Sequence, residues 1–188
     1  MKEIKLSQFG KNRGLFVTSV DDEDYEYLNC FKWHAHKSRY NIYADTTIMR
    51  RDGSQTTIKM PSLIMKIPKG MVLDHIDRNT LNNQKSNLRL CTLSQNNMNR
   101  VRKLNDKYTS KYRGVFFHKH CQKYTGHVGL NHKRYYIGYY KNELDAAHAY
   151  DTLAKKLHGE FASINIRDNK PVSLFGGKHI KQYSLVKK

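Results

Sequence analysis

The spacing of apolar side chains predicts several short strands in the first half of the chain. Residues 14–20 are a strand candidate, and apolar and polar residues alternate over 33–36, 41–47 and 56–60, which is the period of a half-buried strand. Asp52-Gly53 has the composition of a tight hairpin turn between the last two of these strands. We therefore expect a small scaffold of mixed strands before residue 61.

Two polar features of this scaffold have both a structural and a metal-binding interpretation. The acidic run 21–26 follows the first strand, where carboxylates complement the dipole of a helix that begins there. His34 and His36 share one face of a predicted strand, but no third ligand lies near them in the sequence. We favour the structural interpretation for both, with a metal site as the alternative.

The pattern changes over residues 71–100, which read MVLDHIDRNTLNNQKSNLRLCTLSQNNMNR. The apolar runs 71–75 and 88–91 predict two short strands. The loop between them is rich in Asn and Asp, which favour turns because their side chains bond to nearby backbone. We interpret Asn79, Asn82 and Asn83 as such turn-formers, with direct phosphate contact as the alternative.

A helix is predicted to follow the second of these strands. Thr92 and Gln95 have the spacing of a capping box, in which each side chain bonds to the backbone of the other. Asn96 then lies in the first helical turn and points back across the hairpin toward Asp74 and His75. This strand, loop, strand and helix thus bring three polar side chains together.

In the second half, the pattern predicts a sheet followed by one long helix. The aromatic-rich runs 112–118, 124–130 and 133–139 predict strands, and Asn131-His132 predicts the turn between the last two. A helix is expected from Asn142 to about His158, because apolar residues recur on one face, and Gly159 suits its C-terminal end. These residues form the apolar face: Ala146, Ala147, Tyr150, Leu153, Ala154 and Leu157.

Composition identifies the kind of partner. The chain of 188 residues contains 34 Lys and Arg against 16 Asp and Glu, a formal net charge of +18. Most of this excess lies after residue 100, and it predicts a polyanionic partner. A membrane is not expected, because no apolar run approaches the roughly 20 residues that span a bilayer.

The expected location is the cytoplasm. The first ten residues lack the apolar segment of a secretory signal. Cys30, Cys91 and Cys121 are isolated in the sequence, so disulfides are not expected and a reducing compartment fits. His118, His120 and Cys121 lie close together, but a zinc site there is disfavoured because no fourth ligand is near.

Asp74-His75, Asn87 and Asn96, at these spacings, resemble the ββα-metal motif of HNH endonucleases, notably phage and intron-encoded homing enzymes. The resemblance implies His75 as the general base and Asn87 as the catalytic-site residue that holds the loop and orients the histidine. It implies Asp74 and Asn96 as ligands of Mg²⁺ (or Mn²⁺), together with substrate phosphate. The last motif residue is often His. Asn96 in its place shifts the metal preference of the site toward ions that favour oxygen ligands and away from tight binding of Zn²⁺. Arg78 stands where relatives frequently have glycine.

Residues 111–165, in the second half of the chain, resemble the APETALA or ethylene-response-factor DNA-binding domain. The resemblance rests on Tyr-Arg-Gly-Val from 112, Ile-Gly from 137, the run Asp-Ala-Ala-His-Ala-Tyr-Asp from 145, and Ile164-Asn165. It implies a sheet that lies in the DNA major groove. The implied reading positions are Arg113, Phe116, His118, His127, Arg134 and Tyr136; Phe116 and His118 replace arginines of plant members, so the sequence read must differ.

These observations predict an α+β chain of two domains. Mixed strands and the ββα-metal motif (71–100) form a nuclease domain over 1–104, and a linker follows at 105–110. A three-stranded antiparallel sheet packed on one helix forms a DNA-binding domain over 111–165. The chain ends in a basic tail, 166–188.

The expected function is site-specific cleavage of double-stranded DNA by a metal-dependent phosphodiester hydrolase of the homing type. One HNH site per chain favours nicking by a monomer, with a dimer that cuts both strands as the alternative. If the gene is of bacteriophage origin, the enzyme would act in the host cytoplasm. The alternative function is a DNA-binding transcription regulator whose HNH module is inactive; the intact set of four motif residues favours the enzyme.

Overall fold

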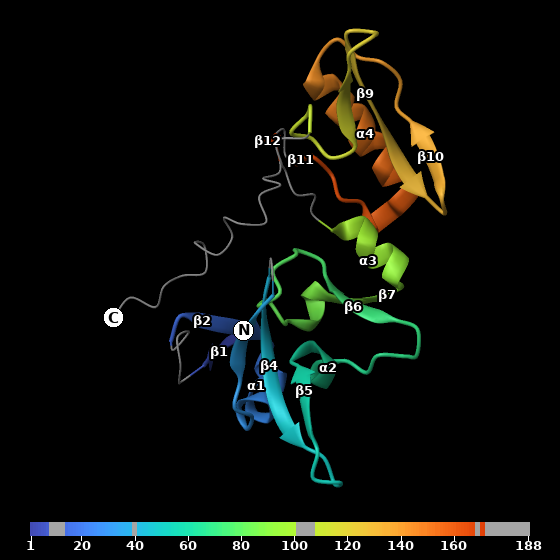
Figure 1. Cartoon of the computed structure of the whole chain (residues 1–188). Helices are drawn as coiled ribbons and strands as arrows, with labels where there is room; N and C mark the ends of the chain where they lie inside the picture. The colour runs from blue at the N-terminus through green and yellow to red at the C-terminus, as the bar shows by residue number, and fades with distance from the viewer. Residues whose placement is uncertain (8–13, 39–40, 101–107, 168–169, 172–188) are drawn as a thin grey trace. The chain divides into compact units, whose positions relative to one another are not determined.

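The computed structural model describes residues 1–7, 14–38, 41–100, 108–167 and 170–171. The described residues form two compact units that divide after Asn96. Figure 1 labels the helices and strands of the described residues, and each unit has its own hydrophobic core. The two units are therefore described separately.

The first unit is built from short strands and helices that form several small sheets. Its elements are β1 (Lys2–Leu6), β2 (Phe16–Val20), α1 (Asp22–Asn29), β3 (His34–Lys37), β4 (Ile42–Met49), β5 (Gln55–Lys59), α2 (Pro61–Ile64), β6 (Val72–His75), the 3-10 turn η1 (Lys85–Asn87), β7 (Leu88–Cys91) and the start of α3 (Leu93–Asn99). Strands β1 and β2 pair, β3–β4–β5 form an antiparallel sheet, and β6 pairs with β7. The alternating segments and apolar runs of the sequence thus predict β2 to β7 to within a few residues.

Two elements of this unit were not expected from the sequence. Strand β1 contains only Ile4 and Leu6 as apolar residues, yet both are buried in the core. All five residues of β1 pair with β2 in antiparallel register. This pairing joins distant positions, so the local pattern of the sequence does not reveal it. Helix α2 is a single turn that begins at Pro61, where a missing N–H costs nothing.

The loop between β6 and β7 is anchored in the core of the first unit. Leu81, in the middle of this polar loop, is 2% exposed and packs with the residues of the scaffold strands. Ser19 of β2 donates its N–H to Leu81 O and accepts from the N–H of Asn83, both at 2.8 Å. Burying one leucine stabilises the fold by about 1.5–3 kcal/mol, so this loop belongs to the scaffold rather than to the solvent-exposed surface.

The acidic start of α1 also holds this loop. Asp21 precedes α1 without capping it, and its carboxylate accepts hydrogen bonds from Lys85 N at 2.7 Å and Gln84 Nε2 at 3.1 Å. The ammonium group of Lys85 pairs with Glu23 and Asp24. The acidic run therefore has a structural role, as expected, but it faces the loop as well as solvent.

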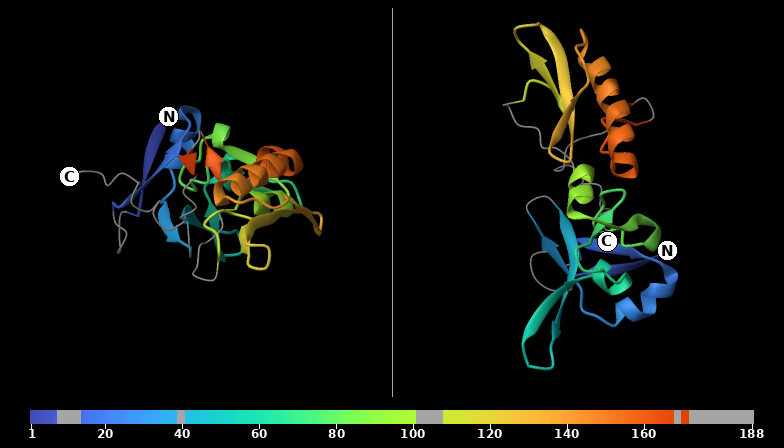
Figure 2. Two further views of the ribbon diagram at one scale, coloured as in Figure 1. Left: turned by 90° about the horizontal axis from the view of Figure 1, so that it is seen from above. Right: turned by 90° about the vertical axis from the view of Figure 1, so that its right-hand side faces the viewer.

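The second unit is a small sheet covered on one face by a helix (Figure 2). Its further elements are β8 (Val115–His118), β9 (Lys123–Leu130), β10 (Lys133–Tyr136), α4 (Glu143–His158), the 3-10 turn η2 (Gly159–Phe161), β11 (Ile166–Arg167) and β12 (Lys170–Pro171). The three main strands lie in the order β10–β9–β8 and are antiparallel. Helix α4 buries Ala147, Tyr150 and Ala154 in a core shared with strand residues Val115 and Val128.

The turns of this unit are those that the sequence predicts. Asn131 and His132 have φ angles of 49° and 62°, the left-handed pair of a tight hairpin turn. Gly159 ends α4 with a φ of 56°. The remaining parts of the predicted linker and tail, 105–107, 168–169 and 172–188, lie outside the described residues. Among the helices that the structure describes, none is long and apolar enough to cross a membrane.

Gly114 marks the tightest approach between the sheet and α4. Its φ is +71°, and a Cβ built there would lie 2.0 Å from Cε2 of Tyr150. Beside it, Asp151 of α4 accepts hydrogen bonds from the backbone N–H groups of Asn165 and Ile166, at 2.7 and 2.8 Å. The amide oxygen of Asn165 in turn accepts from Arg113 N at 2.7 Å. These contacts join the start of the sheet, the helix and the segment that follows it.

Candidate active site

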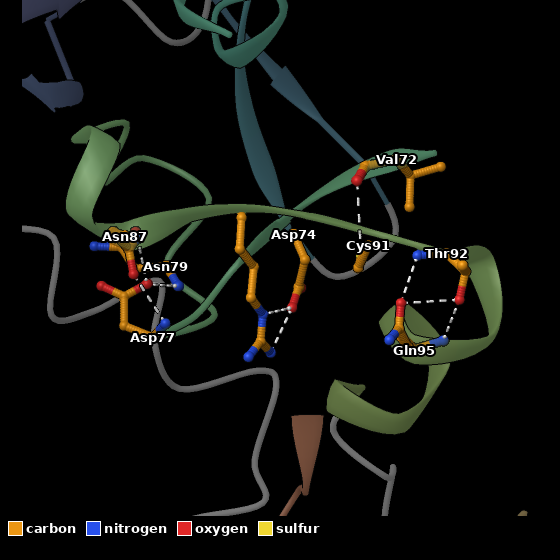
Figure 3. A network of polar contacts seen from close by, with 9 residues as sticks. Val72, Asp74, Asp77, Asn79, Asn87, Cys91, Thr92 and Gln95 are labelled. Atoms are coloured by element: carbon orange, nitrogen blue, oxygen red, sulfur yellow. Dashed lines mark hydrogen bonds and ion pairs between the residues drawn. The ribbon is translucent and has the colours of Figure 1, made fainter. Parts of the chain in front are cut away.

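The predicted motif folds as a hairpin followed by a helix (Figure 3). Strands β6 and β7 pair so that Asp74 lies opposite Arg89 and His75 opposite Leu88. The capping box is confirmed, since Gln95 Oε1 accepts from Thr92 N at 2.8 Å and Thr92 Oγ1 accepts from Gln95 N at 3.2 Å. Figure 3 shows Asp74 and the first turn of α3, marked by Thr92 and Gln95, on the same side of the hairpin.

Asp74 is held by an ion pair that the sequence analysis did not identify. Its Oδ2 atom accepts from Arg89 Nε at 3.0 Å and from the terminal nitrogen Nη2 at 2.8 Å. The two side chains are only 8% and 11% exposed. The pairing of the two strands is the signal that identifies Arg89, because residues directly opposite each other in an antiparallel pair have adjacent side chains.

His75 is buried at the end of β6, and its ring is held by Asn83. The Nε2 atom lies 3.0 Å from Asn83 Oδ1. Burial lowers the pKa of His75 below its ordinary value, while the hydrogen bond to Asn83 and the charges of Asp77 and Asp74 oppose this shift. Asn83, interpreted above as a turn-former, is itself fully buried.

Asn87 joins several parts of the loop through hydrogen bonds. Its Oδ1 accepts from Asp77 N at 2.9 Å, and its Nδ2 donates to Asp77 Oδ1 at 2.9 Å and to the carbonyl of Asn82 at 2.8 Å. It also acts next to the histidine, since Ile76 N donates to the backbone carbonyl of Asn87 at 2.9 Å. The ring of His75 is hydrogen bonded to a different amide, that of Asn83.

The other loop residues form turns. The Asp77 carboxylate accepts from Asn79 N at 2.7 Å and Asn82 Nδ2 at 2.9 Å, and Leu81 N donates to Asn79 Oδ1 at 3.1 Å. The turn-forming interpretation of Asn79 and Asn82 is therefore confirmed. Arg78 has a left-handed φ of 66°, which glycine adopts without cost. The loop makes this turn even though it lacks the glycine frequent in relatives.

Asn96 is half-buried in the first turn of α3, with its backbone N–H donating to Thr92 O at 3.0 Å. With Asp74 it offers one amide oxygen and one carboxylate, which are hard donors of the kind that Mg²⁺ and Mn²⁺ prefer. Within the described part of the chain, no three His, Cys, Asp or Glu side chains gather as a metal site. His36 instead bonds to the buried Asp45, with 2.7 Å between Nδ1 and Oδ2.

In the second unit, five of the six predicted reading residues lie on the sheet face opposite α4, and Arg113 is the exception. The ring of His127 contacts Phe116, with centroids 6.3 Å apart, and Tyr136, at 5.9 Å. Burial lowers the pKa of His127, and the positive charge of Arg134 lowers it further. His118 alternates in phase with Phe116 on β8 and contacts the ring of Tyr139.

Arg113 lies apart from this group. Its Nε donates to the hydroxyl of Tyr150 on α4 at 3.1 Å, and its guanidinium also bonds to the carbonyl of Arg100. The Arg113 side chain is thus hydrogen bonded within the second unit. Its partner Tyr150 is also the residue that Gly114 contacts closely.

The hairpin, the Asn-rich loop and the capped helix, with an Asp-His pair at the end of the first strand, define a nuclease site of the ββα type. A family model described as HNH endonuclease matches residues 66–98. The chain is also 32% identical, over 162 residues, to an uncharacterized HNH endonuclease of Acanthamoeba polyphaga mimivirus. This similarity covers 86% of the chain and 81% of that relative. No solved structure was found to match.

The chain belongs to the HNH endonuclease family. It is a nuclease, and its substrate is DNA. Nucleases of this family generally depend on a divalent metal ion. A stretch of 162 residues in a chain of 188 necessarily includes residues from both units, so the similarity to the viral relative extends beyond the motif.

Proposed function

We propose that the chain is a site-specific, homing-type DNA endonuclease in which the first unit cuts and the second unit reads the DNA. The observation that carries this proposal is the adjacency of Asp74 and His75 on β6, fixed by Arg89 and Asn83. A purely structural loop has no need of a buried histidine beside a buried carboxylate. The viral origin of the relative supports an enzyme encoded by a virus or phage and acting in the host cytoplasm.

In the proposed reaction, His75 is the general base. It accepts a proton from a water molecule, whose oxygen then attacks the scissile phosphorus. Asn87 acts through the backbone next to the histidine, because it fixes the loop that follows β6. Its role is to hold the general base at a constant distance from the phosphate.

The residues present fit a divalent ion of the Mg²⁺ or Mn²⁺ type. Mg²⁺ is usually held by one or two protein oxygens, with phosphate and water completing its shell, and Asp74 and Asn96 supply such a pair. When bound, the ion stabilises charge on the phosphate and assists departure of the leaving oxygen. Arg89 keeps the Asp74 carboxylate in a single orientation.

The second unit is proposed to lay the outer face of its sheet in the DNA major groove, as in the APETALA or ethylene-response-factor domain. The guanidinium group of Arg134 can donate two hydrogen bonds to a base. The neighbouring rings of His127 and Tyr136 can contact the edges of bases on the same face. Phe116 and His118 extend the same face. Arg113, whose Nε also donates to the hydroxyl of Tyr150 on α4, is proposed as the sixth reading position.

The central test is cleavage of a supercoiled plasmid in Mg²⁺, followed by gel separation of nicked and linear products. We expect nicking by a monomer, and His75→Ala lowers the rate by a factor of about 10² to 10⁴, the range for a general base. His34→Ala, which removes an exposed histidine in the same unit, is the matched control. Equal loss in both variants, or full activity in His75→Ala, refutes the assigned role of His75.

A further inference from the structure

A chain of buried hydrogen bonds leads from the scaffold to the ring of His75. The hydroxyl of Thr18, on β2, donates to the carbonyl of Leu81 at 2.8 Å. Asn83 Nδ2 donates to Thr18 Oγ1 at 2.8 Å, and Asn83 Oδ1 faces His75 Nε2 at 3.0 Å. Thr18 and Asn83 are fully buried, and His75 is 7% exposed.

The hydrogen bond from Thr18 to Leu81 determines which atoms donate in the hydrogen bonds that follow. A carbonyl only accepts, and Leu81 O at 2.8 Å is a nearer partner of the Thr18 hydroxyl than the sulfur of Met60 at 3.8 Å, so the hydroxyl donates its proton to Leu81 O. Thr18 Oγ1 therefore accepts from Asn83, which must turn its NH₂ group toward it. The oxygen of the amide is then the atom that faces His75, and His75 Nε2 must be the donor.

Met60 gives an independent check on the orientation of Asn83. Its sulfur lies 3.5 Å from Asn83 Nδ2, and a thioether sulfur is a weak acceptor with no proton to donate. Rotating the amide would place its oxygen against this sulfur and leave Thr18 without a donor. Both contacts of the NH₂ group thus favour the same orientation.

We propose that Thr18 and Asn83 are positioning residues that select the tautomer of His75, with the proton on Nε2 and the lone pair on Nδ1. This inference rests on the proposed role of His75 as general base. In the step it supports, an O–H bond of water breaks and its proton goes to Nδ1. The water oxygen keeps the electron pair and forms a bond to phosphorus, while the bond from phosphorus to the leaving oxygen breaks and that oxygen departs with its electron pair. Nε2 donates to Asn83 both before and after this transfer.

Thr18 lies outside residues 66–98, which the family model matches. In this proposal, the scaffold strand β2 contributes to the nuclease site through the buried hydroxyl of Thr18. The same strand anchors the loop through Ser19, so one element sets both the position of the loop and the proton of the histidine.

The tautomer is measured directly in the full-length protein, free of metal and DNA. Long-range proton–nitrogen spectra of histidine-labelled protein distinguish a ring protonated on Nε2 from one protonated on Nδ1, and His75→Gln identifies the resonances of His75. We expect the Nε2–H form in the wild type. The Nδ1–H form in the wild type would overturn the proposal, whatever the behaviour of any variant.

Three substitutions then connect the tautomer to the rate of single-turnover plasmid nicking. Thr18→Val keeps the shape but removes the hydroxyl; we expect a mixed tautomer and a rate lowered at least about tenfold, below the limit of about 10⁴ for a catalytic histidine in the wrong tautomer. Thr18→Ser retains a hydroxyl, so we expect it to restore both the Nε2–H tautomer and the nicking rate. Thr46→Val is the matched control, since Thr46 is equally buried and donates to the carbonyl of Lys32 at 3.0 Å.

A Thr18→Val enzyme that nicks as fast as Thr46→Val, or keeps a pure Nε2–H ring, contradicts the proposal. Failure of the proposed function has a different signature. In that case His75→Ala retains activity, while the tautomer of His75 in the wild type still reports whether the hydrogen-bond chain selects it.

Discussion

Asp74 makes two different kinds of contact in the proposed enzyme, one to a cation of the protein and one to a cation from solution. Its Oδ2 already accepts two hydrogen bonds from Arg89. A carboxylate has about four lone-pair sites, so an ion pair at one oxygen is compatible with metal ligation by the group. The buried guanidinium fixes the carboxylate, and Asn96 supplies the second protein oxygen.

Asn96→Ala is predicted to raise the Mg²⁺ concentration that gives half-maximal nicking. Loss of one ligand worth about 1.4 kcal/mol corresponds to a tenfold change, and we expect an increase of at least that size, with the maximal rate partly recovered at high Mg²⁺. Asn97→Ala, an exposed neighbour on the same helix, should leave the titration unchanged. A Mg²⁺ titration identical in Asn96→Ala and the wild type would remove Asn96 from the metal site.

Arg134→Ala is predicted to weaken binding to the cognate DNA by about 1–3 kcal/mol, the contribution of an arginine that forks onto a guanine. Lys111, whose ammonium lies over the ring of Tyr112, serves as the comparison. Lys111→Ala should weaken binding to all sequences alike and reduce the salt dependence. Titrations of cognate and random duplexes at several salt concentrations separate the two cases. An equal loss on both duplexes for Arg134→Ala would show that Arg134 contacts only the backbone.

The Asn-rich loop shows what sequence resolves at the residue scale and what it does not. The turn roles of Asn79 and Asn82 follow from local chemistry, and the structure confirms them. Asn83 is the same residue type in the same loop, yet its side chain is buried and hydrogen bonded to Thr18 and His75. Its role depends on where the loop meets β2, a contact between distant positions that no local pattern encodes.

At the scale of elements, periodicity and end signals account for most of the fold. The alternating, apolar and aromatic-rich segments form β2 to β10, and the capping box begins α3 as predicted. Strand β1 was missed because only Ile4 and Leu6 are apolar, so its pairing with β2 decides its conformation. Arg89 was missed for a related reason, since its partner is defined by the register of two strands.

Gly114→Ala is predicted to destabilise the second unit by about 3 kcal/mol. A non-glycine residue with left-handed φ costs roughly 1–2 kcal/mol, and the added Cβ would overlap the ring of Tyr150, which adds about 1–3 kcal/mol of overpacking. Gly129→Ala is the control, because its Cβ would meet nothing closer than 3.9 Å.

Urea unfolding of the full-length protein measures this effect. Trp33 is the only tryptophan of the chain and lies in the core of the first unit. We expect Gly114→Ala to lower the midpoint of unfolding seen by circular dichroism while the midpoint from tryptophan fluorescence stays near the wild-type value. Equal midpoints for the Gly114 and Gly129 variants would show that Tyr150 yields without cost.

At the scale of the whole molecule, the two cores are separate in sequence. The core of the first unit is formed by residues between Ile4 and Leu81, and that of the second by residues between Tyr112 and Ile166. The candidate active-site residues, from Asp74 to Asn96, all belong to the first unit. Cutting and reading are therefore proposed as separable activities of one chain.

Deletion of residues 105–188 is the test of this division. The remaining chain keeps the first core, the hairpin β6–β7 and the whole of α3, so we expect it to fold and to nick DNA in Mg²⁺. It also loses most of the positive charge of the chain and the outer sheet face, so cleavage should require higher protein concentration and become less selective. Mapping nick positions on a long DNA with both proteins measures the change. A truncated protein that nicks the same positions with comparable efficiency would show that the first unit reads its own target, because the residues on β8, β9 and β10 would then contribute nothing to site choice.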